Sequence, residues 1–244
     1  RRTEDDATVQ RTLPPLNTVD WEVGADETLV AGYDELSRVL AETVISGSFV
    51  QRGQAARELD ARLRQKTGIA KARSVAEYVR LLLADTQRVL LAGWHRDVYD
   101  IWLAALADFN PVLYTGTESP AKKRQHVERF TTGDSRVLIM SLRSGAGLDG
   151  LQQHCSDVVV GELDWSPQVH RQLFGRLRRP GQTSQVTAHY LHTNFGSDPV
   201  MIDTLGIKSD QARGIVDPGK SVVPRVTDTS RIEKLARAVL AASA

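Results

Sequence analysis

Apolar side chains recur every three or four positions along residues 26–84, which is the spacing of one face of an α-helix. Three successive segments show this spacing. The apolar positions are Leu29, Tyr33, Leu36 and Leu40 in the first segment, Ala55, Leu59 and Leu63 in the second, and Val75, Val79 and Leu82 in the third. We therefore predict that residues 26–84 form a mostly helical extension.

After Asp85 the pattern changes to short apolar runs that alternate with helical stretches, as in βαβ units with a parallel sheet. Ser119-Pro120 and Ser166-Pro167 have the composition of helix starts, with a capping hydroxyl followed by proline in the first turn. The predicted strands are Arg88–Ala92, Pro111–Tyr114, Arg136–Met140, Asp157–Gly161 and Val186–Leu191. We expect an α/β lobe over 85–195, with its ligands at the carboxyl ends of the strands.

The two ends of the chain have a different composition. Residues 1–25 are irregular and acidic, and the first 40 residues carry nine acids against four bases. Residues 196–244 are irregular as far as Ser230, which with Glu233 forms a capping box for a last helix. We predict a linker from a missing first lobe over 1–25, and an irregular tail with a C-terminal helix over 196–244.

Composition narrows the possible functions. Lys and Arg number 31 against 30 for Asp and Glu, so binding of nucleic acid through bulk positive charge is excluded. The single Cys155 excludes a disulfide framework and a cysteine zinc site. His189 and His192 share a predicted strand but point to its opposite faces, and the other four histidines lie on separate elements, so we predict no metal site in the chain. No apolar run is long enough to cross a membrane. We expect a cytoplasmic protein, and the excess of Arg over Lys suggests a bacterial or phage source.

The segment from Asp164 to Gln182 contains four arginines and no acid after Asp164. A helix that begins at Ser166 must end before Pro180, because proline cannot continue it. Arg176 and Arg179 therefore belong in or near its last turn, and their spacing of three places both guanidinium groups on one side. Two such groups predict a site for a polyphosphate, or for the charge on a phosphoryl group during transfer.

Several motifs together resemble the Swi/Snf-type ATPases, a DNA-translocating branch of the superfamily-two helicases. The array from Gln172 through Arg176 and Arg179 to Gly181-Gln182 resembles the last signature motif of this family, although Arg178 and Pro180 stand where the family usually has His and Ile. Other segments resemble further parts of the family pattern: Arg1-Arg2, Leu13-Pro14, Val89–His95, Tyr114–Gly116 with Ser119 and Arg124, Ser141–Asp149 and Asp164–Gln168.

The resemblance implies a RecA-like second lobe of a motor, with ATP in the cleft between two lobes and double-stranded DNA across both. It implies that ATP and Mg²⁺ are held mainly by the first lobe, and that this chain alone does not hydrolyse ATP. By the same resemblance Arg176 and Arg179 are arginine fingers. The residues implied at the nucleotide are Gln172, Gly147, Asp149 and Gln182, and those implied on the DNA backbone are Thr115, Gly116, Ser141 and Arg143.

A literal phosphate-loop pattern also occurs at Gly214–Ser221, with Lys220 at the lysine position. The stretch before it lacks a buried strand and Pro224 follows it closely, so we interpret the match as chance. Two alternatives to the motor lobe stay open. One is a non-catalytic module that binds nucleic acid or a partner, and the other is a self-contained nucleotidase that uses Lys220.

Overall fold

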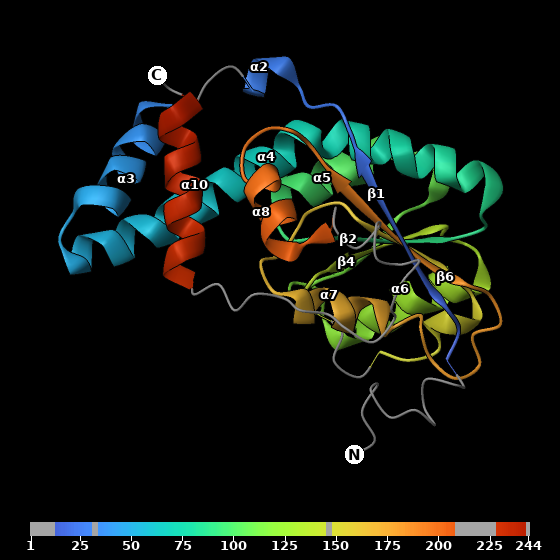
Figure 1. Cartoon of the computed structure of the whole chain (residues 1–244). Coiled ribbons are helices and arrows are strands. Elements are labelled where there is room, and N and C mark those ends of the chain that lie inside the picture. The colour runs from blue at the N-terminus through green and yellow to red at the C-terminus, as the bar shows by residue number, and fades with distance from the viewer. Residues whose placement is uncertain (1–12, 31–33, 145–147, 208–227, 243–244) are drawn as a thin grey trace. The chain divides into compact units, whose positions relative to one another are not determined.

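The computed structural model describes residues 13–30, 34–144, 148–207 and 228–242. The chain divides into two compact units (Figure 1). The first unit comprises residues 1–21 and 75–191, and the second comprises residues 22–74 and 192–244. The phosphate-loop pattern at 214–221 and its Lys220 lie outside the described residues.

The first unit is built on a sheet whose described residues form six strands in the order β1-β6-β5-β2-β4-β3. The strands are β1 (Leu16–Glu22), β2 (Val89–Gly93), β3 (Val112–Tyr114), β4 (Val137–Ser141), β5 (Asp157–Val160) and β6 (Val186–His192). The pairs β3·β4, β4·β2, β2·β5 and β5·β6 are parallel, with Val89 opposite Val137 and Asp157. The predicted α/β fold with a parallel sheet is therefore confirmed.

Strand β1 lies where we predicted an irregular linker. It occupies the edge of the sheet beside β6, and the Val186 amide donates a hydrogen bond of 3.1 Å to the carbonyl of Pro15. Arg178 secures the same segment, since its Nε donates to the carbonyl of Pro14 at 3.0 Å. An edge strand needs apolar side chains on one face at most, and the sequence of β1 alternates only over its last four residues, which gives a weak signal.

Helices cover both faces of the sheet. In Figure 1, α5 (Arg96–Ala105) lies on one side of the strands, and α6 (Pro120–Thr132) and α7 (Pro167–Phe174) lie on the other. Ser119 caps α6 as predicted, because its side chain accepts a hydrogen bond from the Lys122 amide. Ser166 precedes α7 but forms no such bond, so Pro167 alone carries the predicted start signal there. Two short 3-10 helices, η1 (Ala107–Phe109) and η2 (Leu151–Gln153), complete this unit.

The core of the first unit is closely packed around Trp102, which is fully buried. A Cβ atom added to Gly161 would lie 2.6 Å from the Trp102 ring and 3.1 Å from Val75. We expect Gly161→Ala to lower the free energy of unfolding by about 1–3 kcal/mol, because the ring cannot move without displacing its neighbours. Urea unfolding of the chain measures this change.

Gly53→Ala is the matched control, since nothing but the end of Arg57, at 4.0 Å, approaches a Cβ atom there. Gly53 lies inside a helix, so the control should be neutral or stabilising by up to about 1 kcal/mol. Equal effects of the two substitutions would contradict the packing explanation.

The second unit is helical. It contains α2 (Glu27–Val30), α3 (Glu35–Ser46), the first part of α4 (Phe49–Asp85), α8 (Asp198–Leu205) and α10 (Asp228–Ala242). Helix α10 packs along α3, as Figure 1 shows, and both bury apolar side chains such as Leu40 and Leu235. We predicted separate segments around 55–63 and 70–84, but they form one continuous helix, α4.

Candidate functional site

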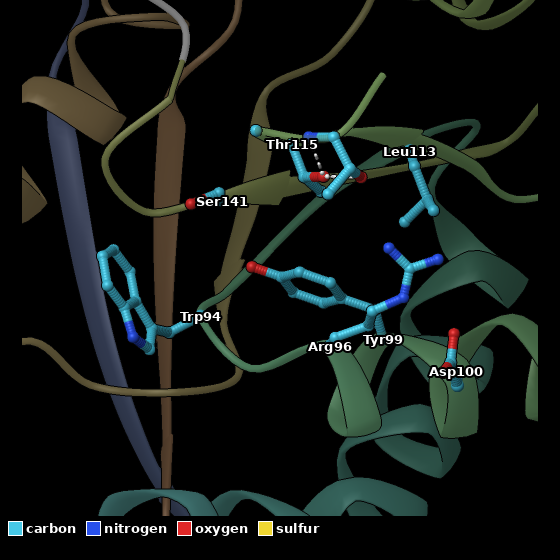
Figure 2. Close-up of a pocket in the computed structure, with 9 residues that line it drawn as sticks. Trp94, Arg96, Tyr99, Asp100, Leu113, Thr115 and Ser141 are labelled. Atoms are coloured by element: carbon cyan, nitrogen blue, oxygen red, sulfur yellow. Dashed lines mark hydrogen bonds between the residues drawn. The ribbon is translucent and has the colours of Figure 1, made fainter. Parts of the chain in front are cut away.

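The carboxyl ends of three strands surround a cavity of about 150 Å³ (Figure 2). Trp94 follows β2, Thr115 and Gly116 follow β3, and Ser141 is the last residue of β4. Parallel strands end at the same edge of the sheet, so these four residues meet although they are distant in sequence. The remaining side chains of the lining are Arg96, Tyr99, Asp100, Leu113 and Thr117.

Thr115 is buried and already engaged by Glu118, a residue that we did not predict. The Thr115 amide donates to Glu118 Oε2 at 2.5 Å and its hydroxyl donates to Oε1 at 3.1 Å. Burial opposes ionisation of Glu118, but hydrogen bonds from Thr115 and Thr117 hold its pKa below the usual value. A phosphate at Thr115 would have to displace this carboxylate, whereas Gly116 beside it has no atom within 4 Å of a Cβ position.

Arg143 follows Ser141 of the lining by two residues and lies between a carboxylate and the ring of Trp94, another residue of the lining. Its Nη2 and Nε donate to Asp164 Oδ2 at 3.0 and 3.2 Å, and its guanidinium carbon lies 5.1 Å from the centre of the Trp94 ring. Asp164 is buried, but 56% of the Arg143 side chain stays exposed. The ion pair therefore orients a cation that still faces solvent.

Asp164 is held in turn by a buried histidine. The Asp164 amide donates a hydrogen bond to His170 Nε2 at 3.0 Å, so this nitrogen accepts and carries no proton. The other ring nitrogen, Nδ1, lies 3.1 Å from the Tyr190 hydroxyl. The Ser166 amide donates to Asp164 Oδ1 at 2.9 Å. His170 thus positions the loop that carries Asp164.

Glu162 fixes the backbone just after β2. Its Oε2 accepts from the amides of Trp94 and His95 at 2.6 and 2.9 Å, and its Oε1 lies 2.6 Å from His95 Nδ1. The Glu162 side chain is 5% exposed. Sequence reasoning missed this role, and the available signal was an acid directly after a buried strand, where solvent cannot satisfy a carboxylate.

The two predicted fingers come shortly after the last turn of α7, near which we expected them. The helix ends at Phe174, and the chain continues in tight turns in which the Arg176 amide donates to the Leu173 carbonyl at 3.0 Å. Arg179 bends back and donates to Asp149 Oδ1 at 2.8 Å and to the Leu148 carbonyl at 3.1 Å. The hydrogen bond from Arg179 lowers the pKa of Asp149.

The guanidinium group of Arg176 has no hydrogen-bond or ion-pair partner among the described residues, although the residue is only partly exposed. Burial lowers its pKa from the usual value, and the nearby positive charge of Arg179 lowers it further, while Tyr114 acts in the opposite direction. The effect of the Arg179 charge on the pKa of Arg176 agrees with the sequence prediction that the two guanidinium groups lie near each other. An unpaired cation beside a second cation is suited to an anionic ligand.

Comparison with known proteins adds sequence relatives, although no family model matches the chain. The human DNA annealing helicase and endonuclease ZRANB3 is 32% identical over 154 residues, which cover 61% of this chain and 14% of the human protein. A Drosophila melanogaster SWI/SNF-related matrix-associated actin-dependent regulator of chromatin subfamily A-like protein 1 is 26% identical over 167 residues, 65% of this chain and 21% of that protein.

Solved structures agree on the fold. The C-terminal part of the Fun30 ATPase domain matches with a TM-score of 0.64 at 13% identity. The match covers 93% of this chain and 97% of the Fun30 chain. The Sulfolobus solfataricus SWI2/SNF2 ATPase core in complex with dsDNA matches with a TM-score of 0.66 at 17% identity. The match covers 95% of this chain and 53% of the Sulfolobus chain.

The sequence relatives and the fold of this chain are those of a Swi/Snf-type ATPase C-terminal lobe. The resemblance found in the motifs is confirmed, and so is the RecA-like fold that it implied. The lobe spans only 14% to 21% of the two curated relatives named above. The relatives are animal proteins, so the predicted bacterial or phage source gains no support from them. Among the described residues, no helix combines the length and apolar character that a membrane crossing requires.

The other residues that we predicted at the nucleotide lie in different settings. Gln172 is exposed on α7, and Asp149 is the exposed partner of Arg179. Gln182 donates through its Nε2 to the Cys155 carbonyl at 2.9 Å, so its amide already serves the fold. Gly147 lies outside the described residues.

Proposed function

We propose that this chain is the second ATPase lobe of an ATP-dependent double-stranded-DNA translocase. In this proposal Arg176 and Arg179 are arginine fingers, and the chain does not hydrolyse ATP without the first RecA-like lobe of the same protein. The observation that carries the proposal is the half-buried, unpaired guanidinium of Arg176 beside Arg179. The curated relatives named as a DNA annealing helicase and a regulator of chromatin support DNA as the partner.

The arrangement fits the outer phosphate of ATP. Negative charge builds up on the equatorial oxygens of a phosphoryl group during transfer, and a preorganised guanidinium stabilises that charge. Arg176 supplies a free cation, and Arg179 supplies a second one whose position Asp149 sets. The site offers cations to the nucleotide, so Mg²⁺ would be held mainly by carboxylates of the first lobe.

Asp149, Gln172, Gln182 and Gly147 stay proposed residues of the nucleotide cleft. Asp149 acts through Arg179, since their 2.8 Å ion pair fixes the direction of the guanidinium group. It is therefore a positioning residue in this proposal. Gln172 is exposed on α7 and is able to reach a ligand.

We propose that the DNA backbone crosses the rim of the cavity at Thr115, Gly116, Ser141 and Arg143. Backbone amides, short hydroxyl side chains and a cation are the groups that contact phosphates without reading sequence. Arg143 is the strongest of these contacts, because its charge is exposed and its direction is set by Asp164. No observation among the described residues favours the non-catalytic module or the Lys220 nucleotidase over this function.

We expect Arg143→Gln to reduce the salt dependence of DNA binding by the complete two-lobe protein. Glutamine keeps a hydrogen-bond donor for Asp164 but removes one positive charge. The slope of log K against log salt concentration should become less steep by about 0.9, which corresponds to one phosphate contact. Fluorescence anisotropy with a labelled duplex, measured over a series of KCl concentrations, gives this slope.

Arg143→Lys and Arg129→Gln are the controls. Lysine retains the charge and should retain the slope. Arg129 is paired with Asp134 just after the end of α6, at the opposite end of the sheet from the cavity, and its loss should leave the slope unchanged. An unaltered slope in Arg143→Gln would refute this DNA path.

A further inference from the structure

The cavity at the carboxyl ends of β2, β3 and β4 has the size and lining of a site for a ring. Its volume of about 150 Å³ is similar to that of an engineered protein cavity that binds benzene. Trp94 supplies an aromatic wall that is 38% exposed, and the Tyr99 ring extends into the cavity from α5 (Figure 2). Leu113 adds an apolar surface.

Tyr99 carries a polar group that the fold satisfies poorly. Its hydroxyl oxygen is buried and forms no hydrogen bond of good geometry with the described residues, although the Ser141 hydroxyl lies close to it. Burial and the charge of Glu162 raise the pKa of this hydroxyl, so it stays protonated at neutral pH, and the weak contact with Ser141 opposes the rise. Figure 2 shows the hydroxyl pointing into the space between Trp94 and Ser141. A buried hydroxyl of this kind is satisfied when a ligand meets it.

The rim of the cavity suits a phosphate chain. Arg143 stacks on the Trp94 ring at 5.1 Å, and Arg96 is an exposed cation of the lining. Gly116 leaves the mouth open, because nothing lies within 4 Å of a Cβ position there. Asp100 is the acidic residue of the lining and lies on α5 beyond Tyr99.

The position of Trp94 is set by buried contacts. Glu162 holds the amides of both Trp94 and His95, and Asp164 holds the Arg143 that stacks on the ring. The ring is therefore presented in a fixed place while 38% of the residue stays exposed. Aromatic rings with cations along a groove are the usual means of binding an unpaired base of a nucleic-acid strand.

We propose that this cavity takes one unstacked nucleobase of the DNA strand whose phosphates pass Arg143. The base stacks on Trp94 and meets the hydroxyl of Tyr99, while the adjacent phosphates stay at the rim. The proposal rests on the proposed function, because it requires DNA at this edge of the sheet. It predicts tighter binding wherever a base is free to leave the helical stack, as at a bulge or a frayed end.

The test compares two duplexes that carry a single-nucleotide bulge. One bulge is a thymidine, and the other is an abasic analogue with the same phosphates and no ring. We expect the complete two-lobe protein to bind the thymidine bulge roughly tenfold more tightly, as measured by fluorescence anisotropy. Trp94→Ala should abolish this difference, and Trp94→Phe, which keeps a stacking surface, should retain most of it.

Two further variants isolate the cavity. Trp21→Ala is the matched control, since Trp21 is a 56% exposed tryptophan on edge strand β1, at the opposite side of the sheet from β3. It should leave the difference at its original value. Tyr99→Phe removes only the hydroxyl group and should reduce the difference several-fold.

Equal affinity of the unmodified protein for the two bulges would overturn the base site. If both duplexes then still bind with the salt dependence set by Arg143, the proposed function survives and the base site alone fails. Absence of any DNA binding would overturn both proposals.

Discussion

Replacing Arg176 with alanine in the complete two-lobe protein is expected to lower DNA-stimulated ATP hydrolysis by a factor of about 10³ to 10⁵. The guanidinium of Arg176 is half-buried and has no partner among the described residues, so its charge is available to a transferred phosphoryl group. Loss of a cation that acts in the transition state lowers kcat more than it raises KM. Release of inorganic phosphate, measured over a range of ATP concentrations, separates the two.

The controls for this prediction come from the same segment. Arg171→Ala removes an exposed arginine of α7 and should leave turnover unchanged. Arg176→Lys should not restore activity, since an ammonium group lacks the planar fork that matches phosphate oxygens. The isolated chain should release no phosphate above background with or without DNA. Near-normal turnover of both Arg176→Ala and Arg179→Ala would refute the finger assignment.

The two arginines differ in a way that the experiment should reveal. Arg179 is tied to Asp149 and to the carbonyls of Leu148 and Gly175, whereas Arg176 has no such ties. Arg179→Ala therefore removes a charge and also releases the loop that carries Asp149. Asp149→Asn keeps both arginines and weakens only the ion pair, so a smaller loss of kcat in that variant would indicate that Asp149 acts by positioning.

Local pattern was enough to predict most of the sheet. The strands β2 to β6 are short apolar runs between polar turns, and their positions follow from the sequence within about one residue. Strand β1 was missed because Leu16–Glu22 contains more polar than apolar residues, alternates only from Val19 onward, and pairs at an edge. The continuous helix α4 was missed because Gly68 and the polar residues before it suggest a break. A glycine inside a helix costs only about 1 kcal/mol, which the burial of Leu63, Ala70 and Ala72 outweighs.

Motif spacing predicted which functional residues meet, but not what holds them. The proximity of Arg176 and Arg179 follows from their separation of three. The partners of Arg143 and Thr115 depend on how loops fold: Asp164 is 21 residues from Arg143, and Glu118 turns back on Thr115 within one turn. Such pairings become visible only in the folded structure, because the sequence offers many acidic residues as equally plausible partners for Arg143 and Thr115.

A buried ion pair in the second unit supports the last prediction. Lys71 of α4 donates to Asp198 Oδ2 at 2.7 Å, and the two side chains are 1% and 3% exposed. The Thr193 amide donates to the same Asp198 oxygen at 3.1 Å. One turn away along α4, Thr67 accepts from the Ser197 amide at 3.0 Å. These contacts attach the loop before α8 to α4 within the unit.

Lys71→Met is expected to lower the free energy of unfolding by about 3–5 kcal/mol, because it leaves the Asp198 carboxylate buried without its cation. Urea unfolding followed by circular dichroism measures this, and fluorescence of the tryptophans tests whether the transition is a single step. Lys234→Met is the matched control: Lys234 lies 3.7 Å from Asp203, the two side chains are 52% and 76% exposed, and its loss should change stability by less than about 1 kcal/mol.

The double variant Lys71→Met with Asp198→Leu decides the cause of the loss. It removes both charges and puts apolar groups of similar volume in their place, so much of the lost stability should return. A double variant as unstable as the sum of its single changes would show instead that Lys71 and Asp198 contribute through packing or through the Thr193 amide. A loss below about 1 kcal/mol in Lys71→Met would show that the pair is not essential to the second unit.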